Sequence, residues 1–273
     1  LIIILVLGTM IRISLNNIIY SKDAESFVFW GYYLKDHSIA ALYENLPGGF
    51  TPLPPFYYYI TRIIAKFIEF FNLWQNQWLT YLIFKIPPIT SEVLTTVLIY
   101  RLVYKYLNKK AANMSVAFYF LHPAIIYNTA VFGQIDSFVS SIAFFALILI
   151  ISRKYFIGLV VYTFGVLSKL QDLAILPLVV LLSTVNLWFK KLIFASSILS
   201  LIVLLPISPV IFDKGIIWTI QYFLQLPNWY PYTSIYTYNI WSFGGFLTPD
   251  STKLFSMVSY RFLGLIIYWV IAL

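Results

Sequence analysis

Long apolar segments constrain this chain more than any other feature of its sequence. Ser137–Ser152 and Leu192–Phe212 contain no charged residue. They approach or exceed the roughly 20 residues that cross the hydrocarbon core of a bilayer. The whole chain is 61% hydrophobic and 10% charged, which is outside the range of soluble globular domains. We therefore expect an all-α, polytopic transmembrane protein with about eight to ten membrane segments.

The formal net charge of +8 does not indicate nucleic-acid binding, because the basic residues stand in short clusters between apolar segments. Such clusters mark the cytoplasmic side of membrane helices. The absence of cysteine excludes disulfides and thiolate metal sites. The chain starts at Leu1 inside an apolar run, so we expect that some residues precede it. No small-residue cleavage site follows this run and Arg12 lies near its far end, so it does not fit a signal peptide.

The order of polar and apolar segments predicts the topology of the first half. Leu1–Leu15 is the first span, and Asn16–Pro55 is a large first outer loop. The helix Phe56–Phe71, which prolines open, either lies flat at the interface or spans the membrane paired with Trp78–Ile86. Both alternatives give Ile89–Tyr106 the same direction, towards a basic cluster that we place in the cytoplasm. That cluster consists of Arg101, Lys105, Lys109 and Lys110.

Two further basic pairs determine the predicted topology of the second half of the chain. Arg153 with Lys154, and Lys190 with Lys191, should both be cytoplasmic, so the chain between them crosses the membrane an even number of times. The polar break in that stretch is Ser168–Asp172, whose flanking arms are short for full spans, so we expect its tip in a cavity below the outer surface. The other predicted segments are Ser115–Phe132, Ser137–Ser152, the arms Phe156–Leu167 and Leu173–Asn186, Leu192–Phe212, a second outer loop Asp213–Phe255, and Ser256–Leu273.

This topology gathers the acidic residues on one side, although acids take no part in assigning it. Of the ten acidic residues, eight fall on the outer side: Asp23, Glu25, Asp36, Glu44, Asp136, Asp172, Asp213 and Asp250. Polar residues from distant segments are therefore expected to meet in one outer, partly membrane-embedded pocket. Ionisable groups at such a place are energetically costly, which makes them candidates for function.

Lys169 is the strongest candidate for a functional residue, because it lies between two apolar arms beside Gln171 and Asp172. One interpretation is a structural ion pair between Lys169 and Asp172 in a hairpin turn. The other is an anion site, most naturally for a phosphate presented from the membrane, since lysine binds phosphate as a point charge.

Carboxylates and aromatic residues of the outer loops are the remaining candidates. Asp23 and Glu25 are either general bases for a sugar hydroxyl or solvated loop acids. Asp136 suits a helix N-cap, a role that does not exclude contact with a ligand. His122 and His37 lack partners at metal-ligand spacing, so we interpret His122 as a hydrogen-bonded packing residue and give His37 no stronger role. Aromatic residues of the second loop form an interfacial belt or stack on sugar rings; they are Trp229, Tyr230, Tyr232, Tyr236, Tyr238 and Trp241.

An acid followed by Phe27, Trp30 and Leu34, with Pro54-Pro55 later at a helix start, is similar to the first outer loop of the GT-C membrane glycosyltransferases. It is the first of four segments, taken in order, that resemble motifs of that superfamily. Phe132–Ser137 is similar to the Trp-Gly-Gln-x-Asp-Ser signature of its GPI-mannosyltransferase-related branch. The other two similar segments are Ser168–Leu173, which resembles a Lys-x-Gln motif, and Pro231-Tyr232 with Tyr238–Trp241, which resembles an Asn-x-Trp motif.

The resemblance implies a GT-C fold and an inverting transfer of a hexose, with mannose favoured. The donor would be a polyprenyl-phosphate sugar and the acceptor a lipid or glycan, on the extracytoplasmic or lumenal side. The resemblance assigns the general base to Asp23, with Glu25 as a second acid, and the donor phosphate to Lys169 and Gln171. It implies substrate contacts by Gln134, Asp136, Asp172, Asn239 and Trp241. No cofactor is implied, and a divalent metal is left open.

The chain departs from the family pattern in three places. Pro52-Leu53-Pro54-Pro55 stands where the family often has Asp-Tyr-Pro-Pro, and Phe132 replaces the usual Trp. The chain stops at Leu273, whereas relatives usually continue, so we expect a single GT-C-like domain over residues 1–273 that is truncated at its C-terminus. Two alternatives stay open. One is a transporter or flippase for a lipid-linked or small polar substrate, which inverted repeats would favour; the other is a non-catalytic assembly partner.

Overall fold

The computed structural model describes residues 1–18, 22–45, 53–184, 189–234, 240–254 and 257–272. Helices dominate these residues, in agreement with the predicted all-α class. A two-stranded antiparallel hairpin pairs Lys253–Leu254 (β1) with Val258–Ser259 (β2) near the end of the chain.

Most predicted apolar segments are helices with similar bounds. They are α1 (Ile2–Ser14), α4 (Pro55–Phe70), α8 (Asp136–Ile151), α9 (Tyr155–Ser168), α10 (Leu176–Thr184), α11 (Phe189–Lys214) and α13 (Tyr260–Ala272). Short 3-10 turns follow α1 and α9, as η1 (Leu15–Asn17) and η3 (Leu170–Ile175). The two predicted outer loops also contain helices: α2 (Lys22–Leu34) and α3 (Ile39–Asn45) in the first, and α12 (Ile216–Gln225), η4 (Leu226–Trp229) and η5 (Ile240–Gly244) in the second.

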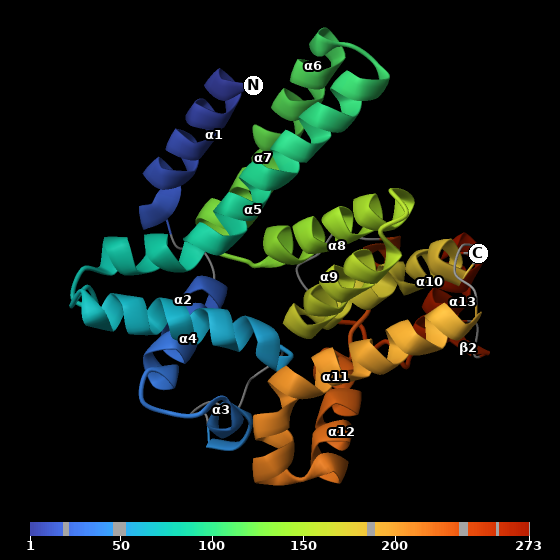
Figure 1. The fold of residues 1–273 in the computed structure, drawn as a ribbon. Coiled ribbons are helices and arrows are strands. Elements are labelled where there is room, and N and C mark those ends of the chain that lie inside the picture. The colour runs from blue at the N-terminus through green and yellow to red at the C-terminus, as the bar shows by residue number, and fades with distance from the viewer. Residues whose placement is uncertain (19–21, 46–52, 185–188, 235–239, 255–256, 273) are drawn as a thin grey trace.

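The predicted separation of Trp78–Ile86 from Ile89–Tyr106 is wrong. Both belong to one helix, α5 (Gln77–Tyr106), which continues through Pro87 and Pro88. Proline removes a backbone hydrogen bond and bends a helix, but it need not end one that is held on both sides. Accordingly, the ribbon of α5 changes direction part-way along its length (Figure 1).

The predicted segment Ser115–Phe132 is divided into three pieces. These are α6 (Lys109–Phe120), α7 (Pro123–Ile126) and a π-helical turn, η2 (Tyr127–Phe132), with a bend of 45° at the break. The break lies at Pro123, which cannot donate a hydrogen bond to α6. His122 caps α7, because its Nδ1 accepts the N–H of Ala124 at 3.2 Å. This hydrogen bond agrees with the structural role predicted for His122.

By length and composition, two described helical segments could cross a membrane: Gln77–Tyr106 and Ser197–Lys214. The bent pair Lys109–Phe120 and Pro123–Phe132 adds a third if it forms one span. Other apolar helices have 10–17 residues, which is short of the roughly 20 that a perpendicular span requires. The chain is thus compatible with a membrane protein, and the larger number of crossings stays a prediction.

The helices form three groups that meet near the start of α8 (Figure 1). One group contains α1, α5 and α6, a second contains α8 to α11 with α13, and a third contains α2, α3 and α4 beside α12. Aromatic packing joins the two outer loops, since Tyr43 of α3 lies edge-on to Tyr222 of α12 with ring centroids 5.3 Å apart. Segments far apart in the sequence therefore share one core.

An ion pair between Arg12 of α1 and Glu92 of α5 lies fully inside this fold. Arg12 Nε is 2.6 Å from Glu92 Oε2, and both side chains are 0% exposed. The guanidinium also donates to the carbonyl oxygens of Gly8 and Phe120, and it lies 4.1 Å from the centroid of the Phe120 ring. One side chain thus connects α1, α5 and α6.

Replacing Arg12 alone should destabilise the fold more than replacing the whole pair. Arg12→Met leaves Glu92 as an unpaired buried carboxylate, which costs about 3–5 kcal/mol. Arg12→Met/Glu92→Met removes both charges and should recover most of that loss. Apparent melting temperatures in detergent measure the difference. A double variant no more stable than Arg12→Met would contradict this account of the pair.

Candidate active site

Gly133 allows the segment before α8 to approach helix α2. Its φ is +74°, in the left-handed region that residues with a Cβ avoid. A Cβ at this position would lie 2.6 Å from the Cβ of Ala24. Glycine therefore lets residues 133–136 lie against the first turn of α2, where Gln134 Nε2 donates to Asp23 Oδ2 at 2.7 Å.

A second pairing joins the start of α8 to the end of α9. Lys169 Nζ lies 2.5 Å from Asp136 Oδ1, with the lysine side chain 17% exposed and the aspartate 40% exposed. The helices α8 and α9 pack against each other, and α9 ends at Ser168, so that the next residue reaches the first turn of α8. We call Asp23, Gln134, Asp136 and Lys169 the four-residue cluster.

Two sequence-based interpretations are therefore wrong. The partner of Lys169 is Asp136 rather than Asp172, because the backbone leaves the helical conformation at Lys169 and the packing of two helices replaces a local turn contact. Asp136 is not the N-cap of α8, since Ile135 occupies that position and Asp136 is the first helical residue. The alternative left open for Asp136, contact with a ligand, stays a prediction.

Opposing effects set the proton affinity of Asp23. Burial raises its pKa above the ordinary value of 3.8, and the negative charge of Asp136 adds to the rise. The hydrogen bond from Gln134 and the positive charge of Lys169 lower the pKa. Tyr230 lies within electrostatic reach, because burial and then the charge of Asp23 raise the pKa of this tyrosine. Asp23 is thus a stronger base than a solvated carboxylate.

A cavity of about 350 Å³ adjoins the cluster and shares Asp136 with it. Gln171, which is exposed, and Asp172, which is buried, line the same cavity. The carbonyl oxygen of Asp172 accepts a hydrogen bond from the Tyr162 hydroxyl at 2.8 Å. A Cβ at Gly165 would collide with Asp172 Oδ2, so only glycine at this position lets the carboxylate pack against α9. The structure therefore places both predicted polar residues beside the cluster.

The other predicted site residues do not belong to the four-residue cluster. Glu25 is exposed and stands two positions after Asp23, about 200° further around α2, so the two acids do not share a face. Trp241 lies edge-on to Tyr260 with ring centroids 5.6 Å apart, which connects η5 to α13. Outside the described residues are Asn239, Tyr236, Tyr238 and the side chain of Glu44.

Three buried charged residues near the site escaped the sequence-based selection: Arg12, Lys85 and Glu92. Lys85 Nζ donates to the carbonyl oxygen of Ala130, in the π-helical turn before Gly133, at 2.6 Å. Each is an isolated charge inside an otherwise apolar segment, and this pattern could have identified them. Burying such a charge costs free energy unless a partner is present.

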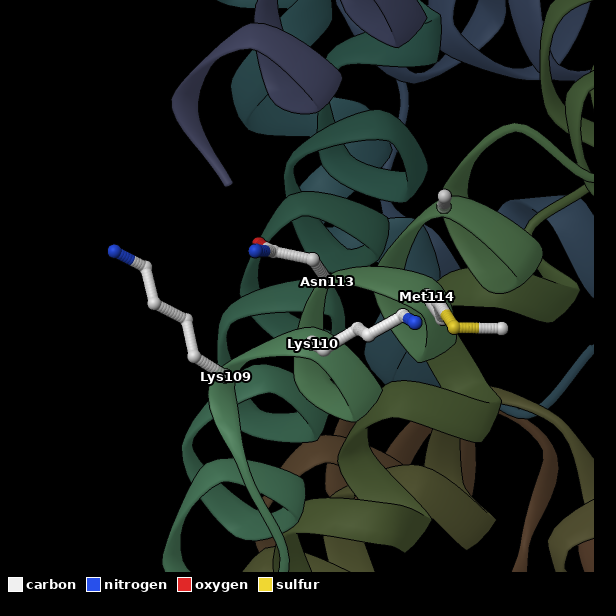
Figure 2. Close-up of a pocket in the computed structure, with 5 residues that line it drawn as sticks. Lys109, Lys110, Asn113 and Met114 are labelled. Carbon is white, nitrogen blue, oxygen red and sulfur yellow. The ribbon is translucent and has the colours of Figure 1, made fainter.

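Away from the cluster, a hollow of about 550 Å³ lies beside the start of α6 (Figure 2). Figure 2 shows Lys109 extending outward and Lys110 running towards Met114. These lysines are exposed and belong to the predicted cytoplasmic cluster. Among the described residues, no group of three or more His, Asp or Glu side chains is arranged to hold a metal ion.

No protein-family model matches the chain, and no curated protein is significantly similar to it.

Gly133→Ala tests the close approach of the α8 segment to α2. This substitution introduces a strained backbone and a steric clash with the Cβ of Ala24. The strain alone should cost about 1–2 kcal/mol. Ala24→Gly removes the clashing Cβ, so it should raise the apparent melting temperature of Gly133→Ala, whereas in the wild type it should lower it because glycine destabilises a helix by about 1 kcal/mol. Equal effects of Ala24→Gly in the two backgrounds would mean that the approach to Ala24 is not as close as described.

Proposed function

We propose that this chain is an integral membrane glycosyltransferase of the GT-C type. It transfers a hexose, with mannose favoured, from a polyprenyl-phosphate sugar to a lipid or glycan acceptor on the non-cytoplasmic side. The observation that carries the proposal is the four-residue cluster, in which a carboxylate of raised pKa lies within electrostatic reach of the Lys169 ammonium. A base for the acceptor and a cation for a leaving phosphate are the groups that this reaction requires.

In this mechanism Asp23 accepts the proton of an acceptor hydroxyl as its oxygen attacks the anomeric carbon of the donor. The bond between that carbon and the phosphate oxygen breaks, and its electron pair leaves with the phosphate. Lys169 stabilises the developing negative charge as a point charge. Attack from the face opposite the leaving group inverts the configuration. Gln134 holds the Asp23 carboxylate in place through its hydrogen bond.

The distribution of charge supports an outer location for the cluster. The basic residues at the turn between α5 and α6 are all exposed, namely Arg101, Lys105, Lys109 and Lys110. Figure 1 shows this turn at the far end of its helical group from the start of α8. If the basic turn is cytoplasmic, the cluster lies towards the opposite side of the membrane.

Asp23→Asn should abolish sugar transfer while the protein remains folded. The amide can still accept the hydrogen bond from Gln134, but it cannot take up a proton, so we expect a loss of about 10²–10⁴-fold. Asp36→Asn is the matched control, because Asp36 is an exposed acid that pairs with Lys35 at 2.6 Å. Transfer of radiolabelled hexose from polyprenyl-phosphate mannose or glucose in membranes measures both. Equal transfer by wild type and Asp23→Asn would exclude Asp23 as the base.

The rate of transfer should depend on pH through Asp23. A base acts when unprotonated, so the rate should rise with pH through its pKa, and the acidic limb should lie above 3.8 because burial raises that pKa. Gln134→Leu removes a hydrogen bond that lowers the pKa, so the limb should move to higher pH. The pH profile of kcat/KM measures this shift, and an unmoved or lowered limb would contradict the assignment.

A further inference from the structure

One carboxylate oxygen of Glu92 holds both ends of the segment that carries Gln134 and Asp136. Ser137 Oγ donates to Glu92 Oε1 at 2.6 Å, and Thr129 Oγ1 donates to the same atom. The other carboxylate oxygen, Oε2, is occupied by Arg12. Because the Glu92 side chain is fully buried, its carboxylate depends on these protein partners rather than on solvent.

The segment between these two anchors is interrupted at residues 133–135, so it is not held in place by one continuous helix. It leaves the π-helical turn at Phe132, passes through the left-handed Gly133, and enters α8 at Asp136. The N–H groups of Gly133 and Gln134 both donate to the carbonyl oxygen of Asn128. These bonds shape the turn but do not attach it to α5, and a helix interrupted in this way commonly marks a functional region.

The contact between α5 and α8 continues beyond the carboxylate. Thr95 Oγ1 donates to Ser141 Oγ at 2.7 Å, and Ser141 Oγ donates to the carbonyl oxygen of Ser137 at 2.5 Å. The hydrogen-bonded contact between α5 and α8 therefore extends one helical turn beyond Glu92, to Thr95. Together these bonds fix the first turn of α8, which bears Asp136, relative to α5.

We propose that Glu92 is a positioning residue for the candidate active site. It fixes residues 129–137 against α5 and thereby sets Gln134 beside Asp23 and Asp136 beside Lys169. The role in catalysis rests on the proposed function, whereas the positioning of the segment does not. Arg12 contributes by holding the Glu92 carboxylate in the orientation that Thr129 and Ser137 require.

Two double variants separate positioning from the stabilising effect of the ion pair. Arg12→Met/Glu92→Gln and Arg12→Met/Glu92→Met both lack the two charges, but only the first retains an oxygen at residue 92 that accepts from Thr129 and Ser137. The glutamine variant loses Arg12 as a partner of residue 92 but keeps the acceptor for these two hydroxyls. The glutamine variant should therefore hold the segment more firmly than the methionine variant does.

The first readout is hydrogen exchange measured by mass spectrometry, which needs no activity. Arg12→Met/Glu92→Met should raise exchange in peptides covering residues 127–137 by about tenfold, with little change across α9. Arg12→Met/Glu92→Gln, which loses only the contribution of Arg12, should show a clearly smaller rise in exchange than the methionine variant. Equal exchange of this segment in the two double variants, or an equal rise throughout the chain, would overturn the positioning role.

The second readout is the acidic limb of the pH profile for sugar transfer. The groups that face Asp23 are Gln134, Asp136, Lys169 and Tyr230. Release of Gln134 in the methionine variant should move the limb to higher pH and lower kcat by about tenfold, because an orienting hydrogen bond is lost. A merely structural role would reduce the amount of active protein without moving the limb.

The two readouts distinguish failure of this inference from failure of the proposed function. If hydrogen exchange of residues 127–137 rises but the acidic limb of the pH profile does not move, Glu92 does not act on Asp23 through this segment. Absence of transfer by the wild type would overturn the proposed function instead, and the exchange comparison would still decide whether Glu92 positions the segment.

Discussion

Arg12 on α1 and Glu92 on α5 form an ion pair of 2.6 Å with no exposure to solvent. Two charges in such surroundings are tolerated only when their hydrogen-bonding capacity is satisfied. Arg12 meets this condition with carbonyl groups of α1 and α6, and Glu92 with hydroxyls on either side of Gly133. The pair therefore joins the first helical group to the segment that leads into α8, and the arrangement of the candidate site depends on it.

The cluster at that junction contains two carboxylates with different surroundings. Asp136 is paired with the ammonium of Lys169, whereas Asp23 is held by the neutral amide of Gln134. Burial raises the pKa of Asp23, and Lys169 limits that rise. Pairs of titratable groups whose environments differ in this way are typical of sites that move a proton. The adjoining cavity offers space for a ligand next to these groups.

Much of the helical content and part of the site could be predicted from the sequence. Apolar length and flanking basic residues were sufficient for helices such as α8 and α9, and the motifs around Asp136 and Lys169 led to residues that lie in one cluster. The continuity of α5 through Pro87 and Pro88 could not be predicted, because packing decides whether proline ends a helix or bends it. The partner of Lys169 and the role of Glu92 depend on contacts between helices, which local spacing does not contain.

We propose that the cluster transfers a sugar rather than holding one during transport. The most direct test uses proteoliposomes that contain this chain alone, a polyprenyl-phosphate hexose labelled in the sugar, and extracted membrane lipids as acceptors. Label entering a new product and polyprenyl phosphate released in equal amounts are the predicted result. Intact donor that only moves from one leaflet to the other would contradict the account and favour a flippase.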